Sequence, residues 1–303
     1  MKFVCVGHAT YDITLPVENY PVENKKQRIS QKIECGGGPA CNASYLLGKW
    51  NSDVSFVGVV GNDYYGQQII KELNSIGVNT EYVEKNSSTD TDSSYIVSNL
   101  SNGTRTILTT KKKEIASLDN PVDITNASYV LVDGEHYITA KEVLLRNPKA
   151  ISVLDAGRFT KEVVSLGQIV NYVVCSKEFA ENFSKINVDY NNTNSIIEIY
   201  KVLKSFYKDQ TVIITLEDKG SFTCINNNYH LIPSIKVKTV DSTGAGDIFH
   251  GAFIYFLSQN YPLEKVIKLA SITSALSVTK IGSRLSIPEL EEVSKVYSNY
   301  ETI

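Results

Sequence analysis

The sequence predicts an α/β fold, in which a mostly parallel, doubly wound sheet is covered by helices on both faces. Apolar runs of strand length alternate along the chain with segments of helical length, which is the pattern of such folds. The chain has 303 residues, 42% of them hydrophobic and 21% charged, which suits a large globular unit. No internal repeat or long linker divides it, so we expect a single domain over residues 1–303.

The first third of the chain predicts strands separated by one strong turn. An apolar run at 3–7 ends in glycine and is typical of a buried strand. Polar stretches punctuated by proline follow at 11–16 and 26–34, and the second alternates with period two, as in a half-exposed strand. The run Gly36-Gly37-Gly38-Pro39 predicts a turn with proline at the first helical position. The other elements expected here are a helix over 40–50, a strand over 54–60 and a helix over 64–76.

A hairpin and the early polar strands predict a second, smaller sheet. Residues 93–99 and 104–109 flank Ser101-Asn102-Gly103, a strong hairpin signal. We expect this hairpin and the early polar strands, over about 11–35 and 90–110, to form a small β-sheet lid standing off the main body.

The rest of the chain alternates between strands and helices. Helices are expected between the strands and after Lys177, with a polar break at 191–194. The expected strands are 129–132, 151–154, 172–174, 211–216, the hairpin 221–225 and 229–232, and 235–240. The expected closing helices are 245–258, 263–279 and roughly 288–298.

Composition excludes several classes of protein. The formal net charge of -3 leaves no basic excess for binding a nucleic-acid backbone. No stretch approaches the roughly 20 apolar residues that span a membrane, and no signal-peptide core is present, so we expect a cytoplasmic protein. The five cysteines are odd in number and form no CxxC pair, which favours reduced thiols. No histidine spacing indicates a structural zinc site.

The strongest chemical signal is the run from Asp241 to Asp247, Asp-Ser-Thr-Gly-Ala-Gly-Asp, at the start of an apolar helix. A helix start presents free backbone N–H groups and partial positive charge, so it can hold a phosphate. Gly244 and Gly246 allow close approach, and Asp247 could accept a proton from a hydroxyl that attacks this phosphate. On spacing alone, a glycine turn followed by a helix-favouring acid explains the run equally well.

The run resembles the second signature of the ribokinase-like, or PfkB, carbohydrate kinase family, and the match continues through Gly251-Ala252-Phe253-Ile254. The resemblance implies a three-layer α/β/α fold and an ATP-dependent phosphotransferase that acts on a sugar hydroxyl with Mg²⁺. It implies that Asp247 is the catalytic base and that the amides of Gly244, Ala245 and Gly246 form the anion hole. It also implies a monovalent cation, K⁺, beside Asp241 and Thr243.

The N-terminal third is similar to the same family. The run Gly37-Gly38-Pro39-Ala40-Cys41-Asn42-Ala43-Ser44 resembles its first signature, and residues 57–66 resemble the strand and turn that follow. Asp12 matches the acid that binds substrate hydroxyls. The substrate-binding residues implied are Asp12, Gly37, Gly38, Asn42 and, by chain position, Arg158, with Tyr95, Arg105 and Glu135 as further candidates.

Two motifs depart from the family's pattern on the nucleotide side. Ser176 and Phe179 replace the Asn and Glu of the Asn-x-x-Glu motif, and Glu217 replaces the middle glycine of Thr-x-Gly-x-x-Gly. The nucleotide-binding residues implied by chain position are Ser176, Thr215, Lys219, Gly220, Thr243, Gly246, Ala275 and Gly282, with Ser283 beside them.

Four other interpretations bear on function. A P-loop fails because 61–66 lacks the lysine, and a dinucleotide fold fails because Gly7 is not followed by GxGxxG. A nucleoside kinase of the same fold remains an alternative, as does a catalytically weak sugar-binding regulator. Exposed edges of the lid predict a homodimer paired through it.

Overall fold

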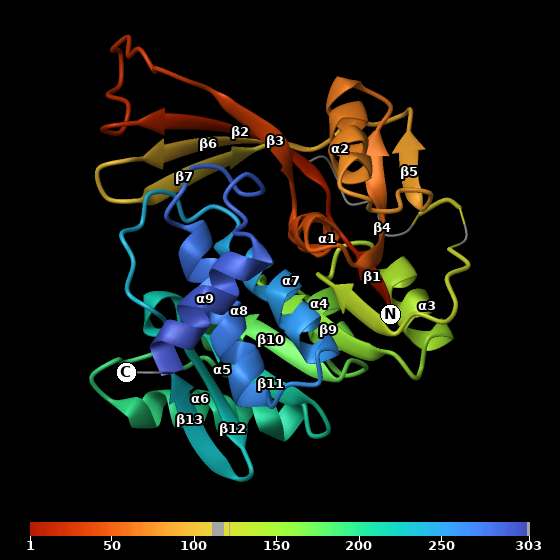
Figure 1. Ribbon diagram of the computed structural model, residues 1–303, viewed down its shortest axis with the longest axis vertical. Coiled ribbons are helices and arrows are strands. Elements are labelled where there is room, and N and C mark those ends of the chain that lie inside the picture. Colours follow the sequence, from red (N-terminus) through yellow and green to blue (C-terminus); the bar gives the residue numbers. More distant parts are fainter. Residues whose placement is uncertain (111–117, 121, 302–303) are drawn as a thin grey trace.

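The structure is a computed structural model that describes residues 1–110, 118–120 and 122–301 (Figure 1). Its main sheet has nine strands in the order β13-β12-β11-β10-β9-β8-β1-β4-β5. All neighbours are parallel except β11–β12 and β12–β13. The strands are β1 Lys2–Val6, β4 Asp53–Gly61, β5 Val83–Asn86, β8 Tyr129–Val132, β9 Ile151–Ala156, β10 Tyr172–Ser176, β11 Thr211–Thr215, β12 Ser221–Ile225 and β13 Asn228–Ile232.

Strand β1 is buried on both faces, as expected for the centre of a parallel sheet. Phe3 and Cys5 belong to one hydrophobic core, whereas Val4 and Val6 belong to a second core on the opposite face. The strands that come next in the main sheet, β4 and β5, lie on one side of β1. The later strands, from β8 onwards, lie on its other side, so the strand order reverses at β1. Open α/β sheets bind ligands outside the carboxyl ends of the strands at this switch point.

Helices cover both faces of the sheet and complete the three layers (Figure 1). Helices α1, α2, α7, α8 and α9 supply the first core, and α3 to α6 supply the second. Their bounds are α1 Pro39–Lys49, α2 Tyr64–Ser75, α3 Tyr137–Arg146, α4 Lys161–Gly167, α5 Lys177–Ser184, α6 Thr193–Phe206, α7 Ala245–Ser258, α8 Leu263–Ser277 and α9 Leu290–Glu301, with a short 3-10 turn at Glu217–Lys219.

A second, four-stranded sheet projects from the body (Figure 1). It consists of β2 Thr10–Val17, β3 Ile33–Gly37, β6 Ser93–Asn99 and β7 Thr104–Thr109, in the order β3-β2-β6-β7. We call it the small sheet. The chain passes from the end of β1 into β2 and from the end of β5 into β6, so the small sheet stands next to the switch point.

The fold expected from the sequence is confirmed, with two local corrections. Residues 26–32 form no strand, because pairing with β2 begins only at Ile33, which lies opposite Thr14. Residues 235–240 also form no strand. Pro233 has no N–H and follows β13 directly, and the segment is held at its far end, where Val240 N–H donates to Val278 O.

All five cysteines are free thiols, and four of them are buried. No helix among the described residues is long and apolar enough to cross a membrane.

Candidate active site

The amino terminus of α7 offers an open cradle for an anion. Gly244 caps the helix with φ 75°, a left-handed conformation that favours glycine, and no side chain caps the helix. Among the described residues, none accepts a hydrogen bond from the amide of Gly246 or Asp247. A methyl group built on Gly246 would meet no atom within 4 Å. Folding therefore does not require glycine at 246, and the space above it is available to a ligand.

Asp247 lies in the first turn of α7, beside this cradle. The Asn42 Nδ2 donates to Asp247 Oδ2 at 2.7 Å. Asp247 is half-buried, and desolvation raises its pKa from 3.8 to about 6. The charge of Asp155 raises this pKa further, whereas the Asn42 hydrogen bond opposes the rise. A carboxylate with a pKa near 6 is ionised at neutral pH and can accept a proton.

Two buried groups lie below the first turn of α7. The Nδ1 of His250 lies 2.6 Å from Gly246 O and 3.1 Å from Asp155 Oδ2, while its Nε2 lies 3.1 Å from Val174 O. Both ring nitrogens therefore face acceptors. His250 and Asp155 were not among the predicted residues, although an acid at the end of a strand and a histidine one helical turn after Gly246 are signals that the sequence carries.

The expected substrate-side residues Asp12, Gly37 and Asn42 lie together next to Asp247. Burial raises the pKa of Asp12 to about 7, an effect opposed by Arg284 and increased by Asp247. A methyl group on Gly37 would lie 2.1 Å from Asp12 Oδ2, so glycine is needed to admit this carboxylate. Gly38, at φ 96°, makes the turn from β3 into α1.

A buried cluster centred on Arg284 was not predicted. Its Nε donates to Asn42 Oδ1 at 3.0 Å, its Nη1 to Glu72 Oε2 at 2.9 Å and its Nη2 to Cys41 Sγ at 2.7 Å. Glu72 Oε2 also accepts from the Gly36 N–H at 2.8 Å. Arg284 is thus in contact with Asn42, which holds the predicted base.

Several expected nucleotide-side residues gather beyond the cradle. Ser176 and Thr215 are paired in the ladder at the carboxyl ends of β10 and β11. Ser176 Oγ caps α5 by accepting from the Phe179 N–H. Asp241 joins two loops: its Oδ1 accepts from the N–H and Oγ1 of Thr243, and its Oδ2 accepts from the Gly282 N–H.

The remaining expected residues lie farther from the base or have structural roles. Arg158 is exposed on the loop after β9, within electrostatic range of Asp155. Lys219 is exposed and pairs with Asp218 at 2.8 Å. Gly220 has φ 102°, and a methyl group there would lie 2.0 Å from Ile232 O. Ala275 is buried in α8.

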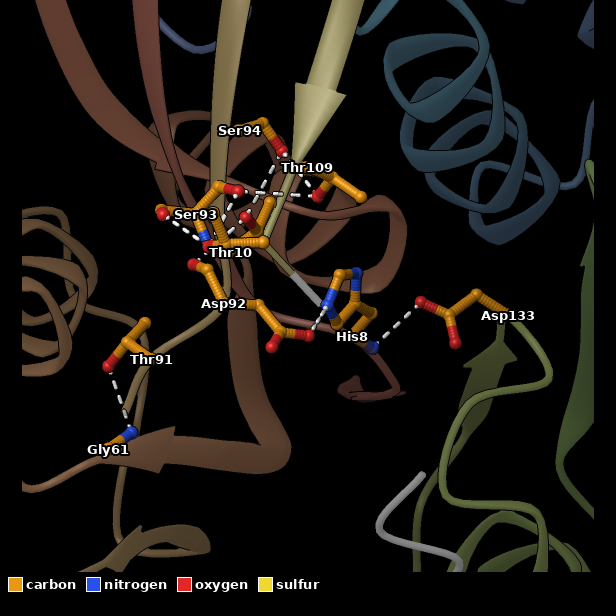
Figure 2. A network of polar contacts seen from close by, with 10 residues as sticks. His8, Thr10, Gly61, Thr91, Asp92, Ser93, Ser94, Thr109 and Asp133 are labelled. Atoms are coloured by element: carbon orange, nitrogen blue, oxygen red, sulfur yellow. Dashed lines mark hydrogen bonds and ion pairs between the residues drawn. The ribbon is translucent and has the colours of Figure 1, made fainter. Parts of the chain in front are cut away.

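The small sheet is joined to the switch point by a polar network, which Figure 2 shows around His8. The His8 N–H donates to Asp133 Oδ2 at 2.9 Å, and His8 Nε2 pairs with Asp92 Oδ2 at 2.9 Å. Asp133 Oδ2 also accepts from the Ala40 N–H at the start of α1. At the far end of the small sheet, Arg105 Nη1 donates to Ser242 Oγ, next to the loop of the cradle.

Comparison with known proteins identifies this arrangement. A family model described as pfkB family carbohydrate kinase matches residues 1–290. The chain belongs to the pfkB family of carbohydrate kinases. This membership confirms the resemblance and the expected enzyme class, an ATP-dependent carbohydrate kinase.

Two relatives of this pfkB protein match over nearly their whole length. A ribokinase of Staphylococcus aureus (strain COL) is 26% identical, and the match covers 97% of this chain and 99% of the ribokinase. A deoxyribokinase of Salmonella typhimurium is 27% identical, with 99% of it and 98% of this chain covered.

Solved structures share the fold of this pfkB protein. A putative ribokinase from Agrobacterium tumefaciens superposes with a TM-score of 0.87 at 23% identity, over 100% of this chain and 99% of that one. Arabidopsis thaliana ribokinase complexed with ribose and ATP gives a TM-score of 0.79 at 22% identity, with 97% of each chain covered.

Proposed function

We propose that the protein, as one kinase domain over residues 1–303, transfers the γ-phosphoryl group of ATP to a hydroxyl of a small sugar or sugar derivative. Asp247 takes the hydroxyl proton, and the amides of Gly244, Ala245 and Gly246 stabilise the charge on the transferred group. Asp12, Gly37, Gly38 and Asn42 bind the sugar. The ribokinase and deoxyribokinase names of the relatives favour a pentose.

One juxtaposition supports this assignment above the others. An ionisable carboxylate shares the first turn of a single helix with the amides of Gly246 and Asp247, which donate to no described residue, and the space above Gly246 is empty. The turn can hold the phosphoryl group while the neighbouring carboxylate contacts the attacking hydroxyl. A regulator without catalytic activity would need the cradle but would not need a base whose pKa is raised to about 6.

ATP brings the Mg²⁺ that the reaction requires. No group of three or more His, Cys, Asp or Glu suited to a metal occurs among the described residues, so the phosphates themselves would supply most ligands. Asp241 is 2% exposed, and among the described residues it accepts hydrogen bonds from Thr243 and Gly282. A buried carboxylate bonded only to neutral donors suits a neighbouring K⁺, and we propose that Asp241 and Thr243 lie beside this ion.

The nucleotide would extend from the cradle towards Ser176 and Thr215, with Lys219, Gly220, Ala275 and Gly282 along its path. The small sheet would act as the lid over the sugar, with Arg158, Tyr95, Arg105 and Glu135 as substrate-side candidates. Its edge strand β7 is exposed along its whole length, and we propose that it pairs with a second copy of the chain. The use of ATP and the free thiols favour the cytoplasm.

A coupled assay of ATP consumption over pentoses, ketohexoses, keto-deoxy acids and nucleosides tests the proposal. A pentose or other sugar should support turnover, and preference for a nucleoside would favour the alternative kinase. Asp247→Asn should lower kcat by at least roughly 10²-fold, the usual contribution of a general base. The control is Asp53→Asn, at the exposed start of β4, which should leave kcat unchanged. Near-normal turnover by Asp247→Asn would refute the role of the base.

A further inference from the structure

The side-chain amide of Asn42 is held at both of its ends. Its Nδ2 donates to Asp247 Oδ2 at 2.7 Å, and its Oδ1 accepts from Arg284 Nε at 3.0 Å. A carboxamide can turn over and exchange its donor and acceptor ends. Arg284 has no acceptor atom, so its contact is compatible with only one of these two orientations.

Arg284 is itself fixed in place. Its side chain is 1% exposed, and its two other nitrogens, Nη1 and Nη2, donate to Glu72 Oε2 and Cys41 Sγ. The guanidinium occupies the space left by Gly36, where a methyl group would lie 2.1 Å from Nη1. The ring of Tyr45 lies 5.2 Å from its central carbon. The residue therefore presents Nε to Asn42 in a single orientation.

We propose that Arg284 is a positioning residue for the catalytic base, because it holds the Asn42 amide with its N–H groups towards Asp247. Without Arg284 the amide can turn its oxygen towards the carboxylate. An oxygen facing a carboxylate disfavours the ionised form, whereas the N–H group favours it. The proposal deepens the proposed function, since it assumes that Asp247 is the base.

The other charged groups around Asp247 do not replace this contact. Asp155 on β9 and Asp133 after β8 disfavour its ionisation, and His250 on α7 favours it. Asp12 on β2 is a further neighbouring acid. Burial, Asp155 and Asp133 all oppose ionisation of Asp247. The hydrogen bond from Asn42 favours ionisation, and this is the contact that Arg284 secures.

Titration of Asp247 in the free protein tests the proposal without substrate. The ¹³Cγ signal of Asp247 is assigned by its loss in Asp247→Asn, and its pKa is measured in Arg284→Lys and Arg284→Met. Lysine keeps the positive charge but has one ammonium group, which we expect to pair with Glu72. Both variants should raise the pKa of Asp247 by about one unit, the value of one hydrogen bond. In the active enzyme, kcat/KM would then fall about fivefold at pH 6 and little at pH 8.

Two controls separate orientation from charge. Glu72→Gln removes a charge from the cluster and keeps an acceptor for Arg284, so the pKa of Asp247 should not move. Asn42→Ala should raise this pKa, and adding Arg284→Lys to Asn42→Ala should raise it no further. Unchanged pKa values in the folded Arg284 variants would overturn the proposal, as would an equal shift in Glu72→Gln or a further shift in the double variant. If Arg284→Met fails to fold, Arg284→Lys and the double variant decide. Failure of the sugar screen would instead contradict the proposed function.

Discussion

The Nδ1 of His250 lies 3.1 Å from the Oδ2 of Asp155, and both side chains are almost completely buried. The pair links α7 to β9 directly beneath the turn that carries Gly246 and Asp247. Asp155 raises the pKa of Asp247, whereas His250 lowers it. The two members of the pair therefore act on the proposed base in opposite directions.

Replacing each member should shift the pH dependence in opposite directions. The base must be ionised, so kcat/KM should fall as pH drops through about 6. Asp155→Asn should lower the pKa of Asp247 and extend activity to lower pH, whereas His250→Gln should raise the pKa and confine activity to higher pH. Profiles of kcat/KM from pH 5 to 9 measure both shifts. Shifts of the same sign in the two variants would contradict the electrostatic account.

Two glycines of one loop should respond differently to alanine. Gly246→Ala should fold normally, because its methyl group meets no atom within 4 Å. Its phosphoryl transfer should nevertheless fall by about 10²-fold, because the methyl group would displace the phosphate from the amides. Gly244→Ala should destabilise the protein, because φ is 75° and the methyl group would lie 2.8 Å from Ser283 Cβ. Thermal unfolding and kcat/KM of both variants distinguish these effects. Full activity of Gly246→Ala would remove the anion hole from the mechanism.

The buried acids should make the protein less stable as pH rises. The pKa of Asp247 rises from 3.8 to about 6 on folding, and that of Asp12 rises to about 7. Between pH 3.8 and about 7, the folded state therefore binds more protons than the unfolded state. The unfolding free energy then falls as pH rises through this window.

Neutral replacements should remove this dependence. Asp247→Asn and Asp12→Asn should each be more stable than the parent protein at pH 8, by roughly 1–3 kcal/mol, with no gain at pH 3.5. Urea unfolding at the two pH values measures the difference. A gain of equal size at both pH values would show that ionisation is not its cause.

The exposed edge of the small sheet should determine the oligomeric state. In β7, Leu108 is 62% exposed and Ile107 is 47% exposed. Leu108→Asp should convert the proposed dimer to a monomer, as measured by light scattering. Leu145→Asp on α3 is a matched control, because Leu145 is also 62% exposed but lies on a helix remote from this edge. A monomeric parent protein would contradict the proposed dimer.

Local patterns predicted most of the fold. Two elements have the predicted bounds: the hairpin Ser93–Asn99 and Thr104–Thr109, and the helix Ala245–Ser258. Their signals, a turn between alternating strands and an apolar helical periodicity, lie within the segments themselves. Strand β5 was not predicted, since its four residues, Val-Glu-Lys-Asn, carry no strong pattern. The segment 235–240 has a strand-like composition but pairs with no described strand.

The site was predictable where a motif lies within one short segment. Asp12, Asn42 and Asp247 come from three such segments, and the structure places them together. Arg284 was not predictable in this way, because its role depends on Glu72 and Asn42, which precede it by 212 and 242 residues. A single buried arginine leaves no periodic signal in the sequence.

Gly38 is the only residue between the end of β3 and the start of α1. The small sheet and the helix that carries Asn42 are therefore joined by a one-residue link, and the positive φ of Gly38 sets the angle between them. We expect a displacement of the small sheet to move α1 and, with it, the Asn42 side chain that contacts Asp247. Under the proposed function, binding of the sugar beneath the small sheet would be coupled through Gly38 to the placement of Asn42 against Asp247. Water has no sugar groups to contact the small sheet, so it would not produce this coupling.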